Sequence, residues 1–178
     1  MSNPNRKILY WLIVLLLFLV QGTVYYWIVP ESWIGRVNPN LVLAAVLFAA
    51  LFVHRHFAMV LGLFFGFLHD VMYYGHMLGL YTFVMGLAGY LTGLAFQKKR
   101  MPFFYVMTVT GVGCLFFDTA VYLLYRLFQV VDESYRWALT EYILPSLLLN
   151  LFFAAALYIP LRRYLEKMTP AEEEEGGA

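Results

Sequence analysis

The chain contains little cysteine and few charged residues, and both shortages narrow what it can be. Its 178 residues include a single cysteine, Cys114, which excludes an internal disulfide and a metal site built from several thiolates. Charged residues make up 13%, about half the share in a typical soluble domain, whereas hydrophobic residues reach 62%. The net charge of +1 provides no overall attraction to nucleic acid. This composition indicates an integral membrane protein.

Sequence motifs of common enzyme classes are absent as well. The chain has no Walker-type phosphate loop, no dinucleotide-binding glycine fingerprint and no Gly-x-Ser-x-Gly nucleophile turn. No pair of carboxylates and no histidine–acid pair has a spacing that indicates acid–base catalysis. We therefore expect no enzymatic activity, no catalytic residue and no cofactor. The remaining alternative is a membrane enzyme that acts on lipid or cell-wall precursors, with Asp70 or Asp118 as its acid.

Six apolar stretches are separated by short polar segments, and they predict an all-α bundle of six membrane-spanning helices. About 20 apolar residues cross a bilayer as a helix. The first stretch has 22 residues and the second only 13, so we expect local thinning of the bilayer around the second. The last stretch contains Pro145, which should kink it. The expected spans cover residues 8–29, 41–53, 57–74, 77–96, 103–128 and 137–161.

These spans form one domain over residues 1–168, and residues 169–178 are expected to be a flexible tail because they include four consecutive glutamates. An alternative for residues 41–68 is a re-entrant hairpin, which would place Arg55 at membrane depth, where a cation costs at least ~2.5 kcal/mol. Two spans are therefore the better interpretation.

The distribution of basic residues predicts that both termini are cytoplasmic, because Lys and Arg are enriched in cytoplasmic loops. With six spans and a cytoplasmic N-terminus, nine of the twelve basic residues fall on the inner side, and the outer side holds Arg36, Arg126 and Arg136. Aromatic residues that favour the membrane interface lie near the predicted outer side: Tyr25, Tyr26, Trp27, Trp33, Tyr73, Tyr74, Tyr125, Tyr135 and Trp137.

Residues 61–93 combine seven glycines with one acid in an apolar stretch. Gly62, Gly66 and Asp70 recur every four residues, so they share one face of a helix. Small residues four apart let two helix backbones approach closely in lipid. We expect a role in helix packing or in binding a partner helix for Gly62, Gly66, Asp70, Gly79, Gly89 and Gly93.

Asp70 and its neighbours leave two interpretations open. Asp70 is either an intramembrane carboxylate that pairs with a partner or positions the following turn, or an interfacial acid that is solvated or caps the next segment. His69 and His76 flank it, but no second carboxylate stands at ligand spacing. We therefore expect no metal site.

Asp118 lies deeper in its predicted span, where an ionisable group is costly and marks a candidate functional site. Its expected partners are Arg126, two turns further along the same helix face, or Asn150 in the last span. Together Asp118, Arg126 and Asn150 form a candidate polar pocket. The alternative is a neutral or paired acid that only bridges helices.

The order of these features resembles the rod shape-determining MreD family. The resemblance rests on Asn38-Pro39-Asn40 before an apolar helix, the Gly62, Gly66 and Asp70 series, Gly79, and Gly89-Tyr90-Leu91 followed by Gly93. It implies a multi-pass protein of the bacterial cytoplasmic (inner) membrane, within the elongation complex that maintains rod shape. It also implies the bitopic protein MreC as a partner, with indirect links to MreB, RodA and penicillin-binding peptidoglycan synthases. The family's helix arrangement is similar to that of the substrate-binding subunits of energy-coupling-factor vitamin transporters.

Two functions from different classes follow from these features. The first is a non-enzymatic scaffold whose glycine-faced helices present a surface to an MreC-like single-span helix. The second is a small-solute binding subunit of a transporter, in which Asp118, Arg126 and Asn150 line an outward-facing pocket. The lack of an internal repeat disfavours the second function.

Overall fold

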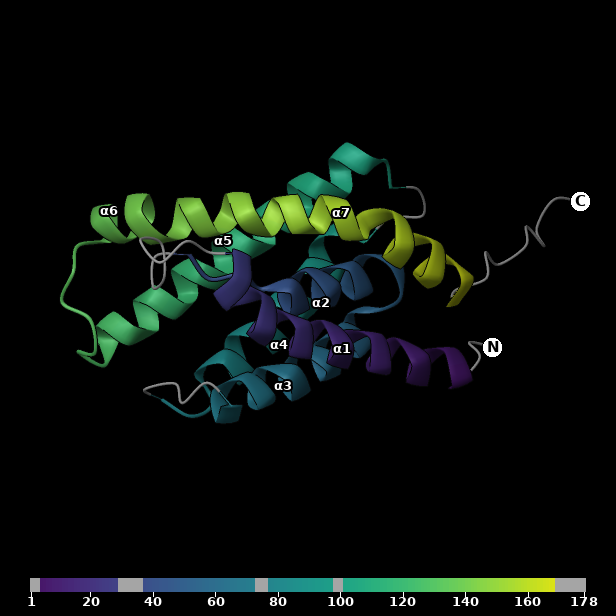
Figure 1. Ribbon diagram of the computed structural model, residues 1–178, viewed down its shortest axis with the longest axis horizontal. Helices are drawn as coiled ribbons and strands as arrows, with labels where there is room; N and C mark the ends of the chain where they lie inside the picture. Colours follow the sequence, from purple (N-terminus) through teal and green to yellow (C-terminus); the bar gives the residue numbers. More distant parts are fainter. Residues whose placement is uncertain (1–3, 29–36, 73–76, 98–100, 169–178) are drawn as a thin grey trace, which may run out of the picture.

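The computed structural model describes residues 4–28, 37–72, 77–97 and 101–168, and all regular structure in these ranges is helical, as predicted. The helices are α1 (Pro4–Ile28), α2 (Leu41–Phe52), α3 (Arg55–Met72), α4 (Leu80–Phe96) and α5 (Phe103–Leu127), followed by α6 (Tyr135–Ala138), the π-helical turn η2 (Leu139–Ile143) and α7 (Leu144–Met168). The last three elements run on as one helix (Figure 1).

Several residues named from the sequence fall outside the described part of the chain. They are Trp33, Arg36, Tyr73, Tyr74, His76, the basic residues 98–100, the acidic tail at 169–178, and the side chains of Tyr25, Tyr26 and Trp27.

Three helical segments are long and apolar enough to cross a membrane: Asn5–Thr23, Phe103–Leu127 and Tyr135–Leu165. Two shorter apolar helices, α2 and α4, accompany them. The count of six spans and the cytoplasmic location of the termini stay predictions. The N-terminus of α1 and the C-terminus of α7 lie at the same end of the molecule, and the Tyr164 hydroxyl joins them by donating to the Arg6 carbonyl at 2.7 Å (Figure 1).

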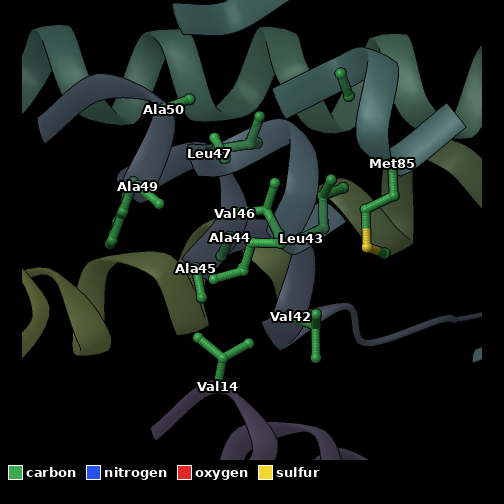
Figure 2. Packing of buried hydrophobic residues seen from close by; sticks show 14 of the residues in the cluster. Val14, Val42, Leu43, Ala44, Ala45, Val46, Leu47, Ala49, Ala50 and Met85 are labelled. Carbon is green, nitrogen blue, oxygen red and sulfur yellow. The ribbon is translucent and has the colours of Figure 1, made fainter. Parts of the chain in front are cut away.

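Helix α2 lies at the centre of the bundle. Residues 41–51 are all buried, and α1, α3, α4, α5 and α7 all contact this helix. Figure 2 shows its alanine and valine side chains between Val14 of α1 and Met85 of α4. A helix that is apolar all round is stable when it is enclosed. The sides of α2 contact protein, so its short length, about 18 Å, does not require the bilayer thinning that we expected from the sequence.

The π-helical turn η2 directly precedes Pro145. A proline inside a helix has no amide hydrogen to donate, and its ring collides with the carbonyl four residues earlier. In η2 the hydrogen bonds reach back five residues, as in the bond from the Leu144 amide to the Leu139 carbonyl. This change of register accommodates Pro145 within a continuous helix.

Candidate functional site

The glycine face of α3 lies against α4 at very short range. A Cβ atom placed on Gly62 would be 2.6 Å from the carbonyl oxygen of Met85, and one placed on Gly66 would be 2.6 Å from the Cα atom of Thr82. Real Cβ atoms essentially never approach another atom so closely. The backbone of α4 therefore fills the space in front of these two glycines, and no partner helix fits there.

The second glycine pair, on α4, brings that helix against α2 and the start of α3. A Cβ atom on Gly89 would lie 2.9 Å from Val46 of α2, and one on Gly93 would lie 2.7 Å from the Cβ atom of Arg55. Of the two roles expected for these glycines, the contacts are those of helix packing within the chain. Close backbone approach at small residues is the usual way in which helices associate in lipid.

Asp70 caps the start of α4 from the end of α3. Its Oδ2 atom accepts hydrogen bonds from the amides of Gly79 and Thr82, both at 3.0 Å, and from the Thr82 hydroxyl at 2.7 Å. Its Oδ1 atom accepts one from the Tyr81 amide at 3.1 Å. The first amides of a helix have no partner within the helix, and the helix dipole favours a negative charge there. Asp70 thus caps the next segment, the second interpretation drawn from the sequence.

Gly79 provides the backbone conformation with which α4 begins at this cap. It is the N-cap residue of α4 and has a φ angle of +93°, a conformation that side-chain-bearing residues rarely adopt. Nothing lies within 4 Å of a Cβ atom placed there, so its backbone conformation, and not lack of space, explains the glycine.

His69 lies beside the cap and stacks on an aromatic ring. Its ring is 4.2 Å from that of Tyr81, with an angle of 14° between the planes, and Tyr81 in turn meets the edge of Phe117 of α5 at 5.6 Å. This stack connects α3, α4 and α5. Within the described residues, no group of three His, Cys, Asp or Glu side chains is placed to hold a metal ion, and His76 is not among those residues.

The three residues of the candidate polar pocket are not joined to one another by the hydrogen bonds of the described structure. Arg126 donates to the Tyr122 hydroxyl at 3.1 Å, and that hydroxyl donates to the Glu133 carbonyl at 2.6 Å. Asn150 bonds to the segment before α2. Asp118 is only 6% exposed, and its Oδ2 atom is buried with no hydrogen-bond partner among the described residues. The pocket stays a prediction.

The hydrogen bonds of Asn150 belong to a polar network that was not predicted from the sequence. Its Oδ1 atom accepts from the Asn40 amide at 2.7 Å, and its Nδ2 atom donates to the Asn38 carbonyl at 3.4 Å. The Asn38 amide donates to the Ser146 hydroxyl at 3.0 Å. Helix α7 therefore holds residues 38–40 in place.

Two side chains accept hydrogen bonds from the first backbone amides of α2. The Oδ1 atom of Asn40 accepts from the Leu43 amide at 3.1 Å, which makes Asn40 the N-cap residue, and the Gln21 side chain of α1 accepts from the Val42 amide at 3.3 Å. Asparagine before an apolar run is a signal for a helix start. No local sequence pattern indicated that Gln21, Ser146 and Asn150 would accept hydrogen bonds from the amides at and before the start of α2.

The side chains of Asp70, Asn40, Gln21, Asn150 and Ser146 accept hydrogen bonds from backbone amides. They satisfy helix ends that are enclosed by apolar side chains, where an unpaired amide costs about 1–3 kcal/mol. The arrangement fixes the relative positions of α1, α2, α3, α4 and α7. Because the helices are fixed relative to one another, the outer surface of the bundle keeps one shape.

Comparison with known proteins identifies a family. The family model for the rod shape-determining protein MreD matches residues 5–168. The chain is similar to the rod shape-determining protein MreD of Bacillus subtilis (strain 168), with 27% identity over 139 residues, which cover 77% of this chain and 79% of that protein. No solved structure matches the chain. The expected likeness to energy-coupling-factor subunits therefore stays a prediction.

Proposed function

Since the chain belongs to the MreD family of rod shape-determining proteins, we propose that it is a membrane component of the bacterial cell-elongation complex and binds an MreC-like single-span protein. In this proposal the pair helps to organise peptidoglycan synthesis in the inner membrane, with indirect links to MreB, RodA and a penicillin-binding protein. The family is a shape-determining one and not a known enzyme family. The observation that carries the proposal is the family match across residues 5–168.

The surface that receives the partner has to be an exposed apolar helix face, because the glycines of α3 and α4 are occupied within the chain. Two such faces lie on the long outer helices. On α1, Leu12, Leu16 and Leu19 are exposed, and on α7, Leu148 and Phe152 are exposed. Helices associate in lipid through van der Waals packing and occasional hydrogen bonds. A rigid bundle core supports such packing, because the receiving face then keeps one shape.

A purification experiment tests the proposed partner. The tagged chain is extracted in mild detergent, and proteins that co-elute at stoichiometric yield are identified by mass spectrometry. We expect a bitopic protein with a coiled-coil outer domain. Its absence from all stoichiometric fractions, while the tagged chain stays folded and monodisperse, would contradict the proposal.

Variants of exposed residues then locate the receiving face. Leu16→Ala changes the face of α1 and Phe152→Ala changes that of α7, and neither side chain belongs to the buried core. We expect one of them to lower the partner yield severalfold without lowering the thermal stability of the isolated chain. Val112→Ala, at an exposed position of α5, is the matched control.

A second candidate function is favoured by one observation, the buried and unpartnered Oδ2 atom of Asp118. In a small-solute binding subunit this atom would accept a hydrogen bond from the solute. The same purification distinguishes the two functions, because a transporter subunit would co-elute with an ATPase pair and a membrane coupling subunit.

A further inference from the structure

One end of the bundle gathers cations from three helices. It is called the basic end here and is defined by Arg6 and Lys7 of α1, Arg55 of α3, and Arg162 and Arg163 of α7. The hydrogen bond between Tyr164 and Arg6 joins α7 to α1, and the Lys7 amino group lies 6.0 Å from the ring of Phe57 in α3. The five residues therefore share one end, where the helix termini meet (Figure 1).

The acidic side chains that the structure describes lie toward the other end. Asp70 is near the end of α3 opposite Arg55, and Asp118 is in the second half of α5. Asp132, Glu133 and Glu141 lie between α5 and α7, whereas Glu166 lies on α7 at the basic end, three residues after Arg163. The five cations that define the basic end outnumber Glu166, so their excess positive charge attracts anions.

Aromatic rings contact three of the five cations of the basic end, Lys7, Arg55 and Arg162. Tyr10 stacks on Tyr164 at 6.2 Å and meets Phe57 at 6.0 Å, which forms one cluster between α1, α3 and α7. Arg55 lies 5.9 Å from the ring of Tyr90, and Arg162 lies 5.4 Å from that of Tyr158. Arg163 is exposed beside this cluster.

Exposed apolar residues continue from the cations along both outer helices. Ile8, Leu12 and Leu16 follow Arg6 and Lys7 along α1. Ile159 and Phe152 precede Arg163 on α7, one and three helical turns away. Cations at the end of a long apolar face match a molecule with an anionic head and apolar chains. An acidic soluble protein would match the cations alone.

We propose that the basic end binds anionic phospholipid, with headgroup phosphates at Lys7 of α1 and at Arg163 of α7 and the acyl chains along the exposed faces of these two helices. The site would tie the bundle to the membrane leaflet that contains anionic lipid. Its acyl-chain faces share Leu12, Leu16 and Phe152 with the faces proposed for the protein partner. The lipid is tested without the partner, because binding is read out with purified chain and lipid alone.

Lipid binding to the purified full chain tests this proposal. The chain is delipidated in neutral detergent, and phosphatidylglycerol or phosphatidylcholine with the same acyl chains is added while bound lipid is counted by native mass spectrometry. Each cation near a membrane surface contributes about 1 kcal/mol to the binding of anionic lipid, which is about fivefold in affinity. We expect phosphatidylglycerol to bind more tightly, and about fivefold weaker binding for each of Lys7→Gln and Arg163→Gln.

Matched variants separate the site from general charge effects. Arg136→Gln removes one exposed cation at the other end of the bundle and should leave the affinity for phosphatidylglycerol unchanged. Lys7→Arg keeps the charge and should keep the affinity. Thermal unfolding without added lipid checks that every variant is folded.

Four outcomes would overturn the proposal. They are equal binding of the two lipids, an equal loss in Arg136→Gln, full phosphatidylglycerol affinity in the Lys7→Gln and Arg163→Gln double variant, and stabilisation by inorganic phosphate as strong as that by phosphatidylglycerol. The last outcome would show that the apolar faces contribute nothing. Salt-sensitive capture of an acidic soluble protein in place of a lipid preference would assign the basic end to a protein.

Discussion

The carboxylate of Asp70 accepts hydrogen bonds from both the backbone amide and the side-chain hydroxyl of Thr82, at 3.0 and 2.7 Å. This double contact fixes the end of α3 to the first turn of α4, where the two helix backbones also lie in close contact at Gly66. A membrane protein that presents a surface to a partner needs such fixed points, because apolar contact with lipid alone does not hold helices together.

Asp70→Asn should destabilise the bundle. An amide nitrogen would replace one carboxylate oxygen and face backbone amides that also donate, so at least one donor would lose its partner. We expect a loss of about 2–3 kcal/mol in the free energy of unfolding, measured by thermal unfolding in detergent. Asp132→Asn, at an exposed loop position, removes the same charge and should change the stability little. Equal stabilities of the two variants would contradict the capping role.

Gly66→Ala and Gly111→Ala should have different effects on the free energy of unfolding: the first should lower it and the second should not. The added methyl group at position 66 would meet the α4 backbone at 2.6 Å, and backbone cannot move aside without separating the helices. At position 111 it would meet the flexible Leu151 side chain at 3.5 Å, an ordinary contact. We expect Gly66→Ala to cost about 1–3 kcal/mol and Gly111→Ala to be neutral or stabilising by up to about 1 kcal/mol. Thermal unfolding of both variants under the same conditions gives the comparison.

Gln129→Gly should stabilise the end of α5. The Val130 amide donates to the Tyr125 carbonyl and the Gln129 amide to the Arg126 carbonyl, the pattern of a Schellman C-cap. Gln129 has a φ angle of +59°, where glycine is favoured. We expect a gain of about 1 kcal/mol, seen as a higher unfolding temperature. A lower unfolding temperature would mean that the Gln129 side chain makes a contact worth more than the strain.

Asp118→Asn should not destabilise the chain, in contrast to Asp70→Asn. The Oδ2 atom of Asp118 has no donor among the described residues, so the substitution breaks no hydrogen bond there. An amide is also cheaper to bury than a carboxylate. We expect the free energy of unfolding to change by less than about 1 kcal/mol, with thermal unfolding as the measurement. A large loss would show that Asp118 has a stabilising partner.

Asn150→Ala should loosen the segment before α2. The substitution leaves the buried Asn40 amide without its acceptor, because that amide donates to Asn150 at 2.7 Å. We expect a loss of about 1–3 kcal/mol and faster hydrogen exchange at residues 38–43. Ser146→Ala, which removes the acceptor of the half-buried Asn38 amide, should have a smaller effect of the same kind. No increase in exchange at these residues would contradict the role of Asn150.

Local sequence patterns were enough to predict the class and the elements. Hydropathy indicated a helical membrane protein, and in the described part of the chain each of the six apolar stretches overlaps a helix, while the count of six spans stays a prediction. The four-residue spacing of Gly62 and Gly66 indicated close helix packing, and Asn40 before an apolar run indicated a helix start. These properties depend on residues within about two turns of one another, so a single stretch of chain contains the whole signal.

The tertiary structure decided which surfaces and partners these residues have. It encloses α2 on all sides, whereas its length alone suggested a short span in thinned lipid. It places α4 in front of the glycines that a partner helix was expected to occupy, and it pairs Asn40 with Asn150, 110 residues away. Such choices depend on which helices become neighbours. That arrangement minimises the free energy of the whole bundle, and no single segment contains enough information to determine it.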